Sequence, residues 1–253
     1  AARSIVPESM QDPLLYLGAN VQNAINIIRA AEQCGVHKFV LSSTANIFAA
    51  SARPIDEDSQ VVPGSPYGES KRMIEQVLQW TDRLRGVRYA SLRYFNAAGA
   101  DPQCRVGEVH SPETHLIPIV LDVALGRREY LQVFGTDYPT VDGSAVRDYV
   151  HVMDLARAHV LALRRLDRGS LVLNLGTGHG HSVRQVVAMV ELVTGRRVTV
   201  KVAPRREGDP AVLVASCARA EELLGWRPEH NLESIVRTAW AWHSGHSQDV
   251  CSK

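Results

Sequence analysis

Residues 37–44, His37-Lys-Phe-Val-Leu-Ser-Ser-Thr44, decide the fold. The apolar run to Leu41 predicts a short buried strand, and three hydroxyl side chains follow it. Before it, a helix is predicted from Asp12-Pro13 to about Gly35, because apolar residues recur at helical spacing after an N-cap residue and an N1 proline. Helical spacing resumes from Tyr67 through Leu84, and residues 87–94 predict the next strand.

This alternation predicts an α/β fold with a parallel sheet covered by helices and joined by right-handed crossovers. Ser42, Ser43 and Thr44 would then lie at the carboxyl end of a strand, where open α/β sheets bind ligands. Beyond Gly99 the pattern is less regular. It predicts helices near 116–125, 152–166, 182–195 and 232–242, with strands at 131–133, 171–175 and 198–202.

Composition indicates a small-molecule partner. The 253 residues carry 28 basic and 27 acidic side chains, a net charge of +1, which argues against a surface dedicated to nucleic acid or membrane. No apolar run approaches the ~20 residues of a membrane span, and a cytoplasmic protein is expected. The four cysteines form no C-x-x-C pair, so reduced thiols and no metal site are expected.

The candidate chemistry begins with Tyr67 and Lys71, which are four residues apart and therefore share one face of the predicted helix. A free tyrosine has a pKa of ~10, whereas a nearby cation favours the phenolate and makes it a usable base. The spacing alone is weak, since such pairs occur by chance on many helices. A hydroxyl from the 42–44 cluster would complete a catalytic group.

Eight ordered stretches, spread from the first strand to residue 209, carry a more specific signal. They are Leu41-Ser-Ser-Thr-Ala-Asn-Ile-Phe48, Ser65-Pro-Tyr-Gly-Glu-Ser-Lys71, Leu92-Arg-Tyr-Phe-Asn-Ala-Ala-Gly99, Ser111-Pro-Glu-Thr-His-Leu-Ile-Pro118, Val133-Phe-Gly-Thr-Asp-Tyr-Pro-Thr-Val-Asp-Gly143, Val146-Arg-Asp-Tyr-Val-His-Val-Met-Asp-Leu155, Asn174-Leu-Gly-Thr-Gly178 and Ala203-Pro-Arg-Arg-Glu-Gly-Asp209. Together they resemble the extended short-chain dehydrogenases, most closely the UDP-glucose 4-epimerase family, and the resemblance runs to about Trp242.

The resemblance implies a partial Rossmann-type doubly wound parallel sheet with a smaller α+β lobe for the substrate. Residues 1–98 would form the C-terminal part of the NAD-binding domain. Residues 99–253 would mainly form the UDP-sugar lobe, with segments such as 146–177 returning to the first domain. The family's glycine fingerprint for NAD belongs to earlier strands and is not in this sequence.

The sequence opens without Met, and roughly 80 residues are expected to precede Ala1 by the size of βαβ units. The chain as written is therefore expected to bind NAD poorly and to be inactive alone. Gly176-Thr-Gly-His-Gly180 superficially resembles a dinucleotide loop, but its last glycine comes one residue early for G-x-G-x-x-G. It is interpreted as a structural turn.

The resemblance also assigns roles. Tyr67, Lys71 and Thr44 match the catalytic residues: the tyrosine takes the proton of the sugar 4-OH while C4 gives its hydride to NAD, and the hydride later returns to the other face. The match gives contacts to NAD from Asn20, Ser42, Tyr67, Lys71 and Tyr94. It gives contacts to the UDP-sugar from Thr44, Asn96, His115, Leu116, Phe134, Arg147, Arg206, Asp209 and Leu213.

Three alternatives remain open. One is another UDP-sugar 4-epimerase, acting on UDP-N-acetylglucosamine, UDP-glucuronate or UDP-xylose; Leu213, where some members carry a larger aromatic, favours N-acetylated sugars. A dehydratase is disfavoured because Thr44 is followed by Ala45-Asn46, which offer no carboxylate. A catalytically silent binding protein is disfavoured by the intact catalytic residues. The family usually dimerises through helices matched by 12–31 and 67–84, so a homodimer is expected.

Overall fold

The computed structural model describes residues 2–51, 53–206 and 209–245, which pack as two compact units. The first comprises Ala1–Phe95, Ala156–Gly176 and Ala215–Arg227, and the second comprises Asn96–Leu155, Thr177–Val214 and Pro228–Lys253. Residues 146–177 were expected to return to the first domain, and the part of them that does so is Ala156–Gly176. The strand that opens the expected segment, at 146–151, instead pairs with strands of the second unit.

The first unit is built on a parallel sheet of three strands. They are β1 (Lys38–Thr44), β2 (Arg88–Tyr94) and β6 (Leu171–Leu175), in the order β1-β2-β6. The predicted α/β class with a parallel sheet is confirmed. Strand β1 runs further than the apolar pattern predicted, because residues 42–44 continue the ladder opposite Leu92, Arg93 and Tyr94.

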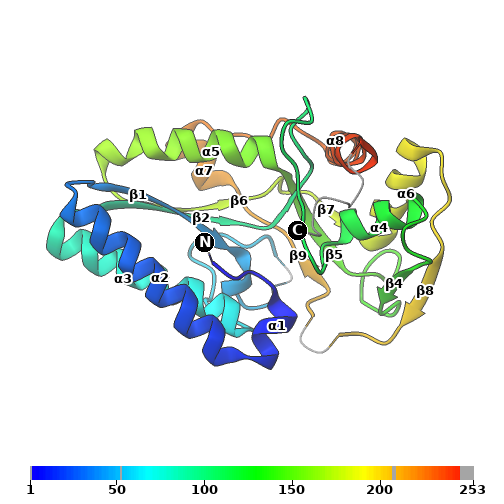
Figure 1. Cartoon of the computed structure of the whole chain (residues 1–253), viewed down its shortest axis with the longest axis horizontal. Coiled ribbons are helices and arrows are strands. Elements are labelled where there is room, and N and C mark those ends of the chain that lie inside the picture. Colours follow the sequence, from blue (N-terminus) through cyan, green and yellow to red (C-terminus); the bar gives the residue numbers. More distant parts are fainter. Residues whose placement is uncertain (1, 52, 207–208, 246–253) are drawn as a thin grey trace, which may run out of the picture. The chain divides into compact units, whose positions relative to one another are not determined.

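Helices cover both faces of this sheet, as a doubly wound fold requires (Figure 1). On one face lie α2 (Pro13–Gln33) and α3 (Pro66–Arg85), and on the other lie α5 (Val152–Arg165) and α7 (Ala218–Leu224). Ile28, Ile74 and Leu78 from α2 and α3 bury against Leu41 and Tyr89 of the strands. Three short helices complete the unit: α1 (Val6–Gln11), η1 (Ala45–Ile47) and η2 (Leu166–Arg168).

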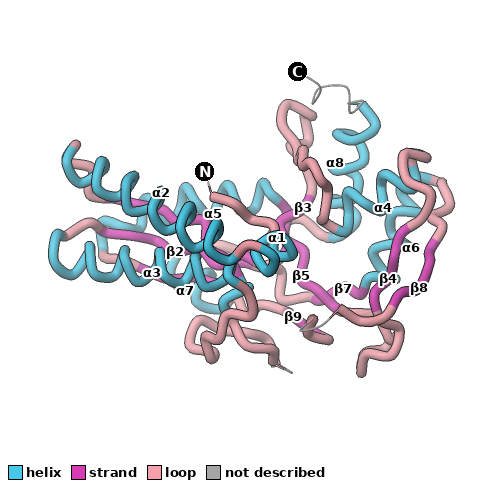
Figure 2. The backbone as a smooth tube through the Cα atoms, turned by 60° about the horizontal axis from the view of Figure 1, so that its bottom comes forward, coloured by secondary structure: helices cyan, strands magenta, loops and turns pink. Residues whose placement is uncertain are grey.

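The second unit contains two small sheets. Strands β3 (Asn96–Ala98), β5 (Val146–His151), β7 (Gly180–Ser182) and β9 (Val212–Leu213) form one, and β4 (Leu131–Phe134) with β8 (Val200–Ala203) forms the other. Figure 2 shows β4 and β8 side by side.

Three helices form the core of the second unit: α4 (Leu116–Ala124), α6 (Val183–Thr194) and α8 (Leu232–Gly245). Their fully buried side chains include Leu121, Val186 and Ile235. Each contributes roughly 1.5–3 kcal/mol relative to exposure. Helix α6 has the termini that its sequence predicts, a capping box between Ser182 and Gln185 and a left-handed Gly195.

Within the described residues, Cys34, Cys104 and Cys217 form no disulfide, and Cys251 lies outside them. No described helix is both long and apolar enough to cross a membrane.

Candidate active site

Tyr67 and Lys71 lie in the first turns of α3, and the sequence explains why the helix begins there. Ser65 caps it by accepting a hydrogen bond from the Gly68 N–H at 3.1 Å, and Pro66 occupies the first helical position. Gly68 lies against η1, where a Cβ atom would be only 2.4 Å from the Asn46 carbonyl oxygen. The glycine therefore allows α3 to lie directly beside the end of β1.

Lys71 is held between α3 and β1. Its Nζ donates a hydrogen bond to the Ser42 carbonyl oxygen at 2.8 Å and lies 6.0 Å from the centre of the Tyr67 ring. The side chain is buried, and burial lowers the pKa of the ammonium while the charge of Glu75 opposes that change. An ammonium has three donors, and within the described residues only Ser42 accepts from this one.

The Tyr67 phenol is also buried, and burial raises its pKa to about 12. Tyr94 and Tyr16 act in the same direction, whereas a hydrogen bond with Thr44 lowers the pKa. The Lys71 ammonium, 6.0 Å from the centre of the ring, therefore does not by itself lower the pKa of the phenol as the sequence analysis expected, because burial outweighs it. A further positive charge beside the ring would lower this pKa.

The three hydroxyl residues of β1 divide their roles, because successive side chains point to opposite faces of a strand. Thr44 bonds Tyr67 and also accepts the Asn46 N–H at 3.2 Å, so it both caps η1 and reaches the catalytic phenol. Ser42 bonds the His159 ring at 3.0 Å. Ser43 donates to the Glu75 carboxylate at 2.6 Å, which gives it a structural role.

Glu75 is the centre of a buried ion pair that the sequence analysis missed. Arg93 donates to its carboxylate through both Nη2, at 2.6 Å, and Nε, and both side chains are about nine-tenths buried. Because Glu75 lies one helical turn after Lys71, the pair fixes the face of α3 that carries the catalytic residues. The sequence did offer a signal for Glu75: Tyr67, Lys71 and Glu75 are four residues apart, which places all three on one face of the helix.

Asn20 and Tyr94, both predicted to contact NAD, differ in how far their side chains are already engaged within the chain. Asn20 is only 2% exposed. Its side-chain oxygen accepts the Arg3 N–H, and its side-chain nitrogen donates to the Arg3 carbonyl oxygen and to the Ser70 hydroxyl. It therefore ties the N-terminal segment to α3. Tyr94, at the end of β2, is partly exposed, and its ring centre is 6.5 Å from that of His159.

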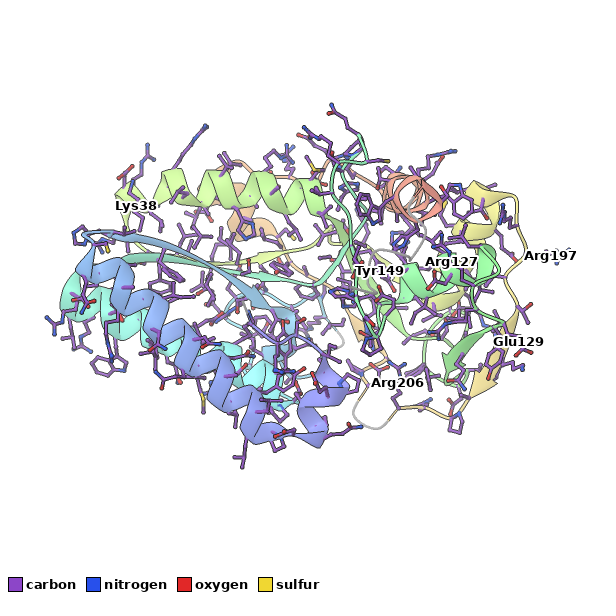
Figure 3. The ribbon with its side chains drawn as sticks, in the orientation of Figure 1. Lys38, Arg127, Glu129, Tyr149, Arg197 and Arg206 are labelled. Carbon is purple, nitrogen blue, oxygen red and sulfur yellow. The ribbon has the colours of Figure 1, made fainter. Side chains whose placement is uncertain are left out.

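In the second unit, the structure brings together four of the predicted UDP contacts in two pairs. Arg147 of β5 forms an ion pair with Asp209. The guanidinium of Arg206, which Figure 3 labels, lies 3.9 Å from the centre of the Phe134 ring, so one face of that ring is covered. A hollow nearby in the sequence is lined by residues 135–137 and 202–205, which directly follow Phe134 and precede Arg206.

The remaining predicted substrate residues lie on different elements of the second unit. Leu213 of β9 is paired with Arg147, and Asn96 of β3 is paired with Tyr149. His115 precedes α4 and bonds Glu108, and Leu116 opens that helix. Tyr149, absent from the predicted site, is a buried neighbour of the Arg147 and Asp209 charges; burial raises its pKa (Figure 3).

The glycine-rich loop at 176–180 binds a carboxylate of the chain itself. The Thr177 and Gly178 N–H groups donate to the Asp148 carboxylate at 2.7 and 3.0 Å, and the Thr177 hydroxyl donates to it as well. These donors are therefore engaged by Asp148, in keeping with the interpretation of this loop as a structural turn.

Comparisons with known proteins identify the family. The model of the NAD dependent epimerase/dehydratase family matches residues 1–176. A UDP-glucose 4-epimerase of Lacticaseibacillus casei is 47% identical over 252 residues, which cover 98% of this chain and 76% of that protein. Two solved structures of UDP-glucose 4-epimerases resemble the chain closely. That from Stenotrophomonas maltophila, with bound NAD and formylated UDP-arabinopyranose, has a TM-score of 0.93 at 41% identity, covering 97% of this chain and 74% of its own. That from Brucella ovis, in complex with NAD, has a TM-score of 0.92 at 43% identity, covering 95% and 75%.

Proposed function

The chain belongs to the NAD dependent epimerase/dehydratase family, and from that premise we propose that it interconverts UDP-glucose and UDP-galactose by inverting C4 of the sugar. The enzyme is an isomerase and its cofactor is NAD. The observation that carries the proposal is the group formed by Tyr67, Lys71 and Thr44, in which a phenol, an ammonium and a hydroxyl meet at the end of β1.

The residues present fit the nicotinamide-ribose end of NAD. The Lys71 ammonium is anchored by one bond to Ser42 and keeps two donors for a sugar diol, and the Tyr67 phenol lies on the same helical face. When bound, NAD supplies a hydride acceptor for C4 and a positive charge of the sign that lowers the pKa of a nearby phenol.

Tyr67 is the proposed acid and base. Its phenolate oxygen takes the proton of the sugar 4-OH and gives it back to the same oxygen atom in the return step, so no proton is consumed overall. Thr44 holds the phenol by a hydrogen bond that favours the phenolate. Lys71, fixed by Ser42, adds a buried positive charge on the same face of α3.

The nucleotide part of the substrate is assigned to the second unit. Arg147 and Arg206 are the proposed diphosphate ligands, because a guanidinium binds phosphate oxygens with two parallel hydrogen bonds. In the structure Arg147 is paired with the Asp209 carboxylate, and the Arg206 guanidinium lies over the Phe134 ring. Phosphate would therefore replace an existing partner, and Asp209 would become free for the ribose hydroxyls. Asn96, His115, Leu116 and Leu213 are proposed to contact the sugar or the diphosphate.

The test is an assay of both directions of the UDP-glucose and UDP-galactose interconversion, with full-length protein supplied with NAD. Tyr67→Phe should lower kcat by about 10²–10⁴-fold, the usual contribution of a positioned proton donor. Tyr130→Phe is the control, because it removes a phenol from the other unit. Undiminished activity in Tyr67→Phe would refute the assignment. Absence of turnover in wild type with NAD bound would move the search to uronic-acid and pentose nucleotides.

A homodimer through α2 and α3 is the second part of the proposal. Both helices expose large apolar side chains, and Leu14, Ile27, Trp80 and Leu84 are each more than half exposed. Light scattering should give twice the monomer mass for wild type and one monomer mass for Trp80→Glu. Leu192→Glu on α6 alters an equally exposed apolar residue elsewhere and should stay dimeric.

The cytoplasm is the proposed location. Three cysteines that form no disulfide among the described residues support a reducing compartment.

A further inference from the structure

The segment that joins β3 to α4 gathers two imidazoles and two carboxylates. Glu108, His110, Glu113 and His115 each offer one ligand atom, and these four atoms all lie within 4.8 Å of one another. The His110 Nδ1 is 2.9 Å from Glu108 and 3.8 Å from Glu113, and the His115 Nδ1 bonds Glu108 and is 3.8 Å from Glu113.

These separations suit a small tetrahedral ion. With bonds of about 2.0–2.2 Å, the ligand atoms of such a site are about 3.3–3.6 Å apart. The contacts of Glu108 with the two imidazoles are shorter than that range and the distances from Glu113 to them are slightly longer, so an ion would draw Glu113 closer and part Glu108 from the two rings. The ring centres of His110 and His115 are 5.0 Å apart and inclined at 73°, so the two rings approach the cluster from different directions.

Contacts outside the cluster hold the Glu113 carboxylate and the Glu108 backbone. The Glu113 carboxylate accepts the N–H groups of Thr114 and His115 at 2.7 and 2.8 Å. The Glu108 backbone accepts the indole N–H of Trp242 at 3.1 Å. Gly107 lies so close to that indole that a Cβ atom would be 2.2 Å from it, so only glycine permits the contact. Such supporting contacts are what orient ligands in metal sites.

We propose that Glu108, His110, Glu113 and His115 form a binding site for a divalent transition metal ion of the zinc type. Two neutral imidazoles and two carboxylates give a neutral complex with a dication and favour zinc over magnesium, which prefers oxygen ligands alone. Both carboxylates are mostly buried while the imidazoles are 38% and 50% exposed, so solvent reaches the site from the histidine side. The sequence analysis expected no metal site because the four cysteines form no C-x-x-C pair, and it did not consider the histidines and glutamates of this loop as ligands.

The role that follows is structural. A bound ion would tie residues 108–115 into one loop immediately before α4, and this loop presents His115 and Leu116, two of the proposed substrate residues. The proposal does not depend on the epimerase function, because it concerns only binding of the ion to the loop.

The experiment uses full-length protein without an affinity tag, stripped with a chelator and titrated with ZnCl₂ by calorimetry. One equivalent should bind to wild type, and MgCl₂ should give no comparable heat. His110→Ala and Glu113→Gln should each weaken zinc binding at least tenfold. His179→Ala and Glu129→Gln change an exposed histidine and an exposed glutamate of the same unit outside the cluster, and both should bind as wild type does.

Thermal unfolding provides a second readout. Zinc should raise the Tm of wild type and of both control variants but not that of Glu113→Gln, which keeps the shape of the side chain and is therefore the variant expected to remain folded. Binding of less than a tenth of an equivalent by wild type would overturn the proposal. Unchanged zinc affinity in His110→Ala and Glu113→Gln would overturn it equally.

Discussion

Gly68 approaches Asn46 so closely that a Cβ atom on Gly68 would lie 2.4 Å from the Asn46 carbonyl oxygen. Because this neighbour is backbone, Gly68→Ala must displace α3 or η1, which carry or adjoin Tyr67 and Thr44. We expect a loss of kcat of at least tenfold. Gly18→Ala on α2, where nothing lies within 4 Å, is the matched control. It should keep full activity and stabilise the protein by about 0.5–1 kcal/mol.

Lys71→Met tests whether the ammonium contributes to the charge that makes Tyr67 a base. A cation lowers the pKa of a neighbouring phenol, so its removal raises that pKa and should move the rise of kcat with pH toward higher pH. The measurement is the pH profile of kcat from pH 6 to 10 with saturating NAD. A profile that keeps its midpoint while only the affinity for NAD falls would limit Lys71 to binding the cofactor.

Glu75→Gln tests the buried ion pair beneath the catalytic helix. It leaves the Arg93 guanidinium buried without its counter-ion, and breaking such a pair costs about 3–5 kcal/mol. The free energy of unfolding in urea measures the loss. Glu129→Gln breaks an exposed ion pair with Lys201 and should cost no more than about 1 kcal/mol. Equal losses in the two variants would contradict the structural role of Glu75.

His151 should make stability fall in mild acid. The ring is fully buried, stacks on His230 at 4.1 Å, and accepts the Met153 N–H at Nδ1, so it is neutral. Burial lowers its pKa to about 4, and the His230 charge adds to that effect. Since the folded pKa lies below the unfolded value of ~6.5, the unfolded state binds the proton first. The stability that the neutral His151 ring contributes is fully present above the unfolded pKa and is lost as the pH falls toward 4.

Urea unfolding of wild type and His151→Gln at pH 7, 5.5 and 4.5 tests this effect. The difference in stability between the two proteins should shrink by up to about 1.4 kcal/mol for each pH unit below 6.5. Comparing the two proteins cancels the contribution of His181, whose pKa burial also lowers. A constant difference across the range would contradict the prediction.

Leu213 offers a test of substrate breadth. It is half-buried on β9 and is paired with Arg147, a proposed phosphate ligand. A leucine should leave room for an N-acetyl group, so wild type should turn over UDP-N-acetylglucosamine. Leu213→Tyr should lower kcat/KM for that sugar at least tenfold while largely preserving it for UDP-glucose. Equal losses for both sugars would remove Leu213 as a determinant of specificity.

The sequence predicted best where pattern and packing agree. The period of α3 and its Ser65-Pro66 start determine its first turn, and the apolar runs of β1, β2 and β6 locate the first sheet. Strands β3, β7 and β9 are only two or three residues long and carry no measurable alternation. They exist because longer neighbours offer them hydrogen bonds, which local sequence does not reveal.

In the site, too, the sequence located residues but not the properties that depend on tertiary packing. The sequence placed Tyr67 and Lys71 on one helix and assigned Ser42 and Thr44 to the same site, and the structure adds the contacts that join them. The high pKa of Tyr67 was not foreseen, because desolvation depends on tertiary packing that no motif describes. The Asn20 amide, assigned to the cofactor by resemblance, is engaged by Arg3 and Ser70 for the same reason.

The interleaving of the two units bears on how the chain is made. Strand β6 completes the first sheet only at residue 175, and the first unit recruits a further segment that ends at Arg227. A ribosome working from the N-terminus therefore releases β1 and β2 long before their third strand, while much of the second unit emerges between them. Until then the free edge of β2 is open to pairing with another nascent chain, so the growing polypeptide has a long interval in which a chaperone would be of use.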